Sequence, residues 1–244
     1  MSTENKIFGI YPVLEAVKSG VVVDKLYVQK GISNPKIEEI LQRLSDHGSV
    51  HHVPVEKLNG LTRGNHQGVV ALIAPISFHS IEALVESATN SEEPALFLVL
   101  DQISDVRNFG AIIRTAECTG VHGIIIQKKG GAPVSGDTVK TSAGAIFRVP
   151  ICKVDHIKDA IFFLQGSGIK TLAASEKAGK SLYNASLNEP LAIIMGSEGK
   201  GVSKSVIQLV DETAALPLLG EINSLNVSVA CGAFLYEVVR QRTA

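Results

Sequence analysis

Tryptophan is absent from this chain of 244 residues, and aromatic residues are scarce, with eight phenylalanines and four tyrosines. Modules that bind single-stranded RNA by stacking bases on aromatic side chains need more of these residues. An excess of positive charge is also missing, because the formal net charge is −1. A generally basic nucleic-acid-binding protein is therefore excluded, although a local basic patch would be enough to bind RNA.

The sequence also lacks the short motifs of several enzyme classes. Its late glycines do not form Gly-x-Gly-x-x-Gly, and no Walker A, His-Glu-x-x-His or Gly-x-Ser-x-Gly pattern is present. Nucleotide hydrolysis, zinc chemistry and serine hydrolysis are thus unsupported, and a Rossmann-type dehydrogenase is disfavoured. The histidines show no metal-ligand spacing, so we expect no metal and ordinary surface or core roles for His51, His52, His66 and His122.

The three cysteines, Cys118, Cys152 and Cys231, show no Cys-x-x-Cys spacing and lie in apolar-rich segments. We expect all three to be buried, and an odd number of buried thiols favours a reducing cytoplasm over a secreted, disulfide-linked scaffold. The first residues are polar, and no apolar run approaches the roughly 18 residues of a membrane-spanning helix. We therefore expect a soluble, cytoplasmic protein.

Apolar sequence is abundant, since hydrophobic residues make up 45% of the chain and charged residues 19%. This composition predicts a well-packed core. The apolar runs fall into two α/β blocks, residues 1–74 and 95–244. A segment rich in serine, glutamate and proline, residues 75–94, separates them and predicts a linker around one short helical stretch.

The first block is predicted to contain strands at 25–29, 50–55 and 68–73 and an amphipathic helix at 34–47. The second block is predicted to contain strands at 96–100, 123–127, 171–174, 191–195 and 213–216 and helices at 109–119 and 225–242. Continuous apolar strands that alternate with helices are typical of a parallel sheet covered on both faces.

Two late segments, 193–203 and 216–228, share one pattern, in which an apolar strand runs into a turn of small residues and then a helix start. Such turns expose backbone N–H and C=O groups that can hold a polar ligand where side chains would crowd it. Two of them close together predict one ligand held mainly by the main chain.

A third segment, 101–117, adds side chains suited to chemistry. Asn108 is placed to cap the following helix, and Arg114 projects from that helix just past a strand's carboxyl end, where ligands of α/β sheets bind. Arg114 could equally be a solvated partner of Glu117, and Glu198 a turn carboxylate that bonds nearby N–H groups. Ser224, Asn226 and Ser228 are more small polar residues than one helix cap requires.

In this order the three segments resemble the motifs of the SpoU/TrmH branch of the SPOUT RNA methyltransferases. Asn108-Phe-Gly with Arg114-Thr-Ala resembles the first motif, Met195-Gly-Ser-Glu-Gly the second, and Leu216-Pro with Ser224-Leu-Asn-Val-Ser the third. In the first block, Phe8-Gly-Ile and His66-Gln-Gly-Val-Val-Ala are similar to the small L30e-like substrate-binding domain of that family. Within the family, the pattern is most similar to the 23S rRNA guanosine 2′-O-methyltransferases of the peptidyl-transferase loop.

The resemblance implies a fold, a cofactor and an assembly. The fold is a SPOUT α/β-knot catalytic domain, with a parallel sheet and a C-terminal trefoil knot, preceded by an L30e-like domain. The cofactor is S-adenosyl-L-methionine, and the family works as homodimers whose active site the first-motif arginine completes. The positions that match its cofactor site are Gly196, Leu216 and Leu225, with Gly199 and Pro217 nearby.

The resemblance also implies roles for side chains in methylating a ribose 2′-hydroxyl. Arg114 would act as an electrostatic clamp or, after losing a proton, as a base, while Asn108, Ser224 and Asn226 orient the ribose and Glu198 fixes the arginine or the loop. RNA selection would fall to the first block, where a turn before Gly68 carries polar side chains. Its candidates are Arg63, Asn65, His66 and Gln67, which could also form no more than a polar turn.

Other functions compatible with the sequence are the same chemistry on tRNA or on another rRNA nucleotide, including an adenosine linked to thiostrepton resistance. A non-catalytic RNA-binding or ribosome-assembly protein is a further alternative. That alternative predicts missing motif groups, and all of them are present.

Overall fold

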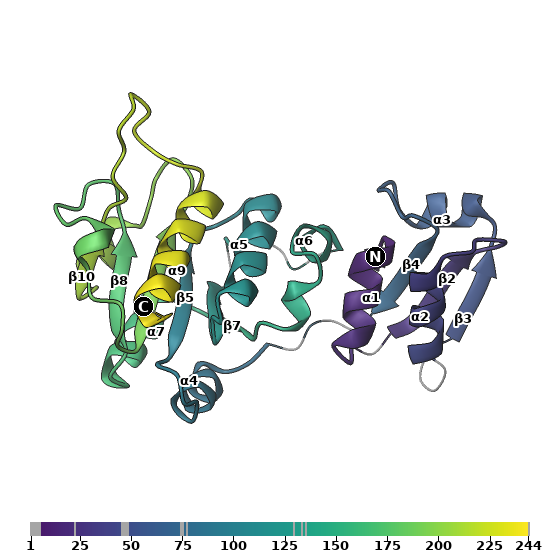
Figure 1. The fold of residues 1–244 in the computed structure, drawn as a ribbon, viewed down its shortest axis with the longest axis horizontal. Coiled ribbons are helices and arrows are strands. Elements are labelled where there is room, and N and C mark those ends of the chain that lie inside the picture. The colour runs from purple at the N-terminus through teal and green to yellow at the C-terminus, as the bar shows by residue number, and fades with distance from the viewer. Residues whose placement is uncertain are drawn as a thin grey trace. The chain divides into compact units, whose positions relative to one another are not determined.

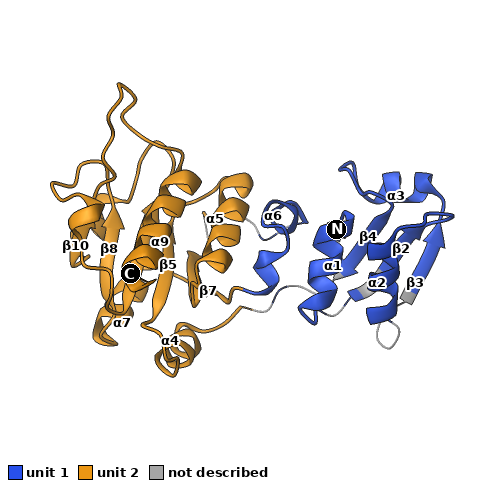
Figure 2. Cartoon of the chain, viewed as in Figure 1, with its two compact units in different colours: residues 1–77, 133–148 blue, residues 78–132, 149–244 orange. Residues whose placement is uncertain are grey.

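A computed structural model describes residues 6–21, 23–44, 49–73, 76, 78–128, 130–132, 134 and 136–243 of the protein. The chain folds as two compact units, residues 1–77 with 133–148, and residues 78–132 with 149–244 (Figure 2). The predicted boundary at residue 74 and the first predicted linker residue, 75, lie outside the described residues. Helix α4 (Ile81–Thr89) occupies much of the predicted linker.

The first unit contains a mixed four-stranded sheet with the order β1-β4-β2-β3. Strand β2 runs parallel to β3 and antiparallel to β4, which pairs antiparallel with β1. The unit's elements are β1 (Lys6–Phe8), α1 (Ile10–Lys18), β2 (Val23–Gln29), α2 (Pro35–Arg43), β3 (Ser49–Val53), α3 (Val55–Leu61), β4 (Val69–Ile73), α6 (Gly136–Thr141) and the 3-10 helix η1 (Ala145–Phe147).

The predicted elements of the first block are found with small shifts at their ends, whereas β1, α1 and α3 were not predicted. Asn34 caps α2 by accepting a hydrogen bond from the Lys36 N–H at 2.9 Å, and the apolar stripe of the helix buries Ile37 and Ile40. The helix ends at Arg43, and the remainder of the predicted span, 45–47, lies outside the described residues.

Residues 133–148, which lie within the predicted second block, pack with the first unit. A Cβ built on Gly136 would lie 2.0 Å from the Lys6 carbonyl oxygen, so only glycine permits this approach. Gly144 has a φ of +88° and packs against the Cβ of Glu15, whose carboxylate pairs with Arg148. These contacts tie α6 and η1 to β1 and α1, and no change in composition marks them in the sequence.

The second unit contains a six-stranded sheet with the order β10-β8-β9-β5-β6-β7, in which every neighbouring pair is parallel. The predicted parallel sheet is thus confirmed, and β7 is the strand that was missed. The unit's other elements are β5 (Leu96–Asp101), α5 (Val106–Cys118), β6 (Gly123–Gln127), β7 (Ile151–Val154), α7 (Ile157–Gly166), β8 (Lys170–Ala174), η2 (Leu182–Asn184), β9 (Leu191–Gly196), α8 (Lys204–Ile207), β10 (Glu212–Ala214) and α9 (Val227–Thr243).

Helices cover this sheet on both faces. Phe97 and Val99 of β5 pack in a cluster with Ile161 and Leu164 of α7, and α5 and α9 lie side by side on the other face (Figure 1). Side chains alternate along a strand, so a strand covered on both faces is largely apolar on both. Every residue of β5 and β9 is buried, as that arrangement requires.

Two of the cysteines are buried, which raises the pKa of Cys152 to about 11 and that of Cys231 to about 12, whereas Cys118 is exposed. The expectation that all three lie in buried positions is therefore wrong for Cys118. In the described part of the chain, no helix has the length and apolar character needed to cross a membrane. The same residues contain no group of three or more His, Cys, Asp or Glu side chains that could hold a metal ion.

Candidate active site

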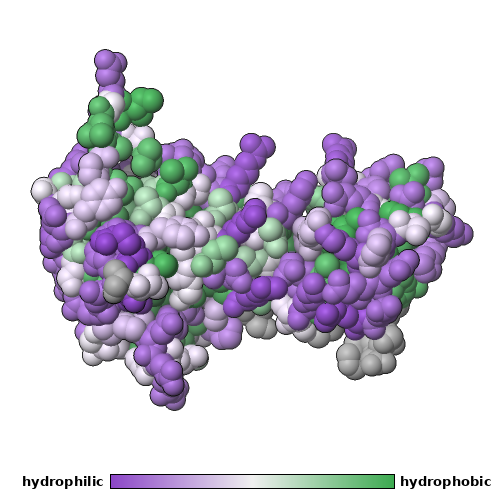
Figure 3. Space-filling model, in the orientation of Figure 1, coloured by the Kyte–Doolittle hydropathy of each residue, from purple (hydrophilic) through white to green (hydrophobic). Residues whose placement is uncertain are grey.

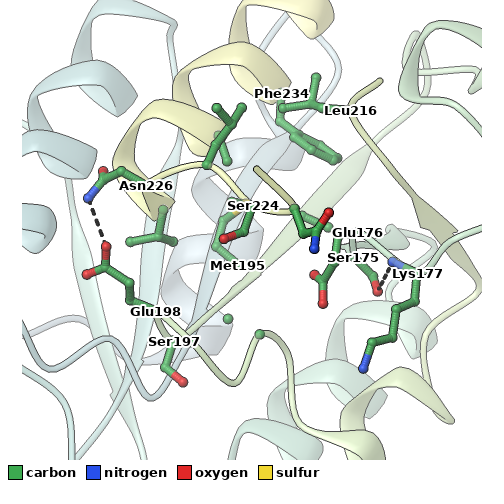
Figure 4. Close-up of a pocket in the computed structure, with 18 of the residues that line it drawn as sticks. Ser175, Glu176, Lys177, Met195, Ser197, Glu198, Leu216, Ser224, Asn226 and Phe234 are labelled. Carbon is green, nitrogen blue, oxygen red and sulfur yellow. Dashed lines mark hydrogen bonds between the residues drawn. The ribbon is translucent and has the colours of Figure 1, made fainter. Parts of the chain in front are cut away.

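A cavity of about 510 Å³ opens at the carboxyl ends of β8, β9 and β10, beside the start of α9 (Figure 4). This edge of a parallel sheet is where α/β proteins generally bind ligands, and the volume is that of a small-molecule site. Apolar lining comes from Met195, Leu216, Leu225 and Phe234, and polar groups reach the cavity from the loops. The cavity therefore suits a ligand that is part apolar and part polar.

The turn after β9 is shaped by glycine. A Cβ built on Gly196 would lie 2.0 Å from the backbone of Gly201 and Val202, so no side chain fits there. Gly199 and Gly201 have φ of +85° and +67°, values that glycine adopts without strain. The Gly201 N–H donates to the Ser197 carbonyl at 2.8 Å, which closes the turn. Its backbone thereby forms one wall of the cavity.

Three polar side chains from distant segments meet beside this turn. The Asn108 amide donates to Glu198 Oε2 at 3.1 Å, and the Asn226 amide donates to Glu198 Oε1 at 3.3 Å and to Asn108 Oδ1 at 3.0 Å. Asn226 Oδ1 accepts hydrogen bonds from the N–H and the hydroxyl of Ser228, so the Asn226 side chain caps the start of α9. Glu198 is thus held by side-chain amides. The alternative prediction, a turn carboxylate that bonds nearby N–H groups, is not what the structure shows.

The prediction that Asn108 caps α5 is wrong. The helix begins at Val106, and Asp105 is the cap, accepting the Asn108 N–H at 2.8 Å. Because Asp105 satisfies the free N–H of the first turn, the Asn108 side chain is available to Glu198. The predicted helix start at 109 was correspondingly too late.

Arg114 lies on the exposed side of α5, while Phe109, Ile112 and Ile113 form the buried stripe. Among the described residues, its guanidinium forms no hydrogen bond or ion pair, so the suggested pairing with Glu117 is absent. Arg114 does not line the cavity of its own chain, whereas Ser224 does. The structure thus brings together four of the five predicted catalytic residues and leaves Arg114 apart.

Four of the five positions predicted to bind a cofactor line the cavity, namely Gly196, Gly199, Leu216 and Leu225, whereas Pro217 does not. Sequence reasoning missed Ser175, Glu176 and Lys177, which follow β8 and also line it. The signal was available, because the strand at 171–174 was predicted and all strands of a parallel sheet end at one edge.

The predicted RNA-binding turn lies in the first unit. His66 Nε2 lies 3.0 Å from Asn59 Oδ1, and His66 Nδ1 accepts the Gly68 N–H at 3.0 Å. Gln67 has a φ of +52°, and its side-chain oxygen accepts the Ile10 N–H at 3.0 Å. His66 and Gln67 therefore shape the turn, as the polar-turn interpretation holds. Arg63 and Asn65 are exposed.

Comparison with protein families relates both units to RNA methylation. Residues 95–236 match the model of the SpoU rRNA Methylase family, and residues 6–79 match that of RNA 2′-O ribose methyltransferase substrate binding. A provisionally named TrmH family tRNA/rRNA methyltransferase of Staphylococcus haemolyticus is 36% identical over 97% of this chain and 95% of its own length.

Solved structures of similar proteins share the fold over nearly the whole chain. The SpoU methyltransferase AviRb from Streptomyces viridochromogenes is 26% identical with a TM-score of 0.83, over 99% of this chain and 90% of its own. The rRNA methyltransferase from Sinorhizobium meliloti with bound AdoMet is 25% identical with a TM-score of 0.82, over 97% of this chain and 87% of its own.

Proposed function

Because the chain belongs to the SpoU family of RNA methyltransferases, we propose that it methylates a ribose 2′-hydroxyl of RNA. Its cofactor is S-adenosylmethionine. The observation that carries the proposal is the cavity at the sheet edge, in which a glycine-shaped backbone wall adjoins the network of Asn108, Glu198 and Asn226. Backbone groups and polar side chains thereby meet at one place.

The lining residues fit this cofactor. Gly196 lets the backbone of Gly201 and Val202 approach closely, which forms the turn that lines the cavity, and the apolar side chains of Leu216, Leu225 and Phe234 suit an adenine ring or a methionine chain. We assign Gly196, Gly199, Leu216 and Leu225 to hold it. Pro217 is left with the indirect role of shaping the loop.

When bound, the cofactor supplies a methyl group on a positively charged sulfur, which is a strong electrophile. The protein's task is then largely to position the hydroxyl for attack. Asn108, Ser224 and Asn226 orient the target ribose, and Glu198 holds the two amides in place. The hydroxyl's proton leaves to solvent as the methyl group is transferred, and Arg114 stabilises the negative charge that develops on the 2′-oxygen. A guanidinium has too high a pKa to take up that proton unaided.

The exposed position of Arg114, away from the cavity of its own chain, supports a homodimer in which it reaches the cavity of a second copy. Apolar side chains also lie exposed on the loop before α9 and on α9 itself, where Leu219 is 100% exposed, Ile222 78% and Val229 58%. The loop before α9 projects from the second unit and carries a hydrophobic cluster (Figure 3). A contiguous exposed apolar patch of this kind suits a subunit interface.

Mixed dimers test this arrangement. Arg114→Ala and Gly196→Ala chains should each be inactive alone, while a mixture allowed to exchange subunits should regain activity. In a mixed dimer, one of the two sites would combine the intact cavity of the Arg114→Ala chain with the intact Arg114 of the Gly196→Ala chain. Failure to regain activity, with both variants dimeric and folded, would place Arg114 at its own chain's cavity or outside the mechanism.

For the RNA, we propose a guanosine in the peptidyl-transferase loop of 23S rRNA, modified in the cytoplasm. The matched substrate-binding region and the similarity of nearly the whole chain to an rRNA methyltransferase support an rRNA target. The trefoil knot implied by the resemblance likewise stays a prediction. Mapping 2′-O-methyl sites in cells with and without the protein should reveal one lost rRNA mark, whereas an altered tRNA map would favour the alternative.

A further inference from the structure

The cavity contains a second carboxylate, Glu176, to which the proposed reaction assigns no task. It follows β8 in a turn held by its backbone, in which the Ser175 N–H donates to the Ala214 carbonyl at 3.0 Å and the Ala178 N–H to the Ser175 carbonyl at 3.1 Å. The Lys177 N–H donates to Ser175 Oγ at 3.3 Å. Glu176 is therefore presented to the cavity from an ordered turn.

Its environment differs from that of Glu198. Both oxygens of Glu198 accept side-chain amides, whereas Glu176 makes no hydrogen bond or ion pair with any other described residue. The two lie on opposite sides of the cavity, with Met195 and Ser224 between them (Figure 4). Even a Cβ built on Gly201 would come no closer than 3.8 Å to Glu176 Oε2, so the facing turn leaves the carboxylate open to a ligand.

An ionised carboxylate offers two acceptor oxygens and no donor, and the two neighbouring hydroxyls of a ribose offer two donors. Acidic residues just past a strand end hold ribose hydroxyls in this way in other nucleoside-binding α/β folds. We propose that Glu176 binds the ribose diol of the cofactor and so selects a ribonucleoside cofactor. This inference rests on the proposed function.

The cofactor's amino group is the competing occupant of this position. Glu176 is exposed at the cavity, and an exposed ion pair contributes little because water screens it. A diol instead gives each of the two carboxylate oxygens a donor at the same time. The two hydrogen bonds have a defined geometry, and the charge on the carboxylate strengthens them. The diol is therefore the partner that Glu176 suits better.

A double-mutant cycle by calorimetry tests the assignment. Wild-type and Glu176→Ala proteins are titrated with S-adenosylhomocysteine and with its 2′,3′-dideoxy form. Loss of charge-assisted hydrogen bonds should weaken binding of the ribose form by about ten- to a hundredfold in the variant. Removing the hydroxyls should weaken binding to the wild type by a similar factor and to the variant hardly at all. Glu221→Ala, which removes an exposed carboxylate outside the lining, is the control and should bind like the wild type.

If removing the hydroxyls weakens binding to Glu176→Ala by as large a factor as it weakens binding to the wild type, the assignment is overturned. It is also overturned if the variant loses affinity for S-adenosylhomocysteine yet binds methylthioadenosine, which has the ribose but no amino group, as well as the wild type does. A folded wild-type protein that binds none of these compounds would instead overturn the proposed function, and with it this inference.

Discussion

The two units use polar side chains in different ways. In the first unit, the side chains of His66 and Gln67 stabilise the polar turn at 63–67. His66 bonds Gly68 and Asn59, and Gln67 bonds Ile10. In the second, Asn108, Glu198 and Asn226 come from segments far apart in sequence and bond one another beside a cavity. A local polar cluster is often structural, whereas convergence of distant polar groups at a sheet edge marks a site.

Removing Arg114 should separate chemistry from binding most sharply. We expect Arg114→Ala to lower kcat by about a hundred- to a thousandfold, the effect of losing one group that stabilises transition-state charge. Affinity for S-adenosylhomocysteine should not change, because the proposed partner of Arg114 is the 2′-oxygen of the RNA and not the cofactor, and Arg114 is absent from the cavity lining of its own chain. Arg107→Ala, on the exposed side of the same helix, is the control. An Arg114→Ala enzyme with full turnover would remove Arg114 from the mechanism.

Disrupting the network in the second unit should have the next largest effect. Glu198→Gln replaces one of the two acceptor oxygens by a donor, so Asn108 and Asn226 cannot both keep their bonds. We expect kcat to fall by about ten- to a hundredfold, since misplaced orienting groups are costly. Lys200→Ala changes the same turn outside the lining and should leave kcat unaltered. Equal rates for the two variants would show that the network is only structural.

A glycine substitution tests whether residues 133–148 belong to the first unit. Gly144→Ala would place a Cβ 2.3 Å from the Cβ of Glu15 at a φ of +88°. The backbone strain alone should lower the free energy of unfolding by about 1–3 kcal/mol. Gly20→Ala has a similar φ, +76°, with no atom nearby, and isolates the strain from the contact. Hydrogen exchange should show faster opening of α1 in Gly144→Ala than in Gly20→Ala, and identical exchange would contradict the packing.

The smallest effect is expected in the exposed part of the polar turn. Arg63→Ala combined with Asn65→Ala should weaken RNA binding by about three- to tenfold and reduce the salt dependence by about one charge. Cofactor affinity should not change. Lys158→Ala, on α7 of the second unit, is the charge-matched control. If binding and its salt dependence are unaltered, RNA recognition lies elsewhere in the protein.

The regular elements could largely be predicted, because strands buried on both faces are almost entirely apolar. In β5, β6 and β9 the only polar residues are Asp101 and Gln127, each at the end of its strand. Strand β1 was not predicted because it has only three residues, and β7 was not predicted because only its first two residues are buried. The position of 133–148 depends on close approaches at Gly136 and Gly144 that no local pattern encodes.

The candidate site was predicted where motifs and strand ends coincide, as at Gly196 and Leu225. Its internal bonding could not be predicted, because Asn108 and Asn226 are 118 residues apart and Asn108 was expected to cap a helix. Only the position of Asp105 shows that the Asn108 side chain is not needed for capping. Glu176 was overlooked although it follows a predicted strand directly, since no motif draws attention to it.

Calorimetric titration of the full chain with S-adenosylhomocysteine tests the central claim, that the glycine-walled cavity of the second unit holds the cofactor. We predict saturable binding with one site per chain, lost in Gly196→Ala and retained in Gly179→Ala, where a methyl group would meet no atom within 4 Å. Folded wild-type protein that releases no heat with this ligand or with S-adenosylmethionine, or Gly196→Ala protein that binds as tightly as the wild type, would contradict it.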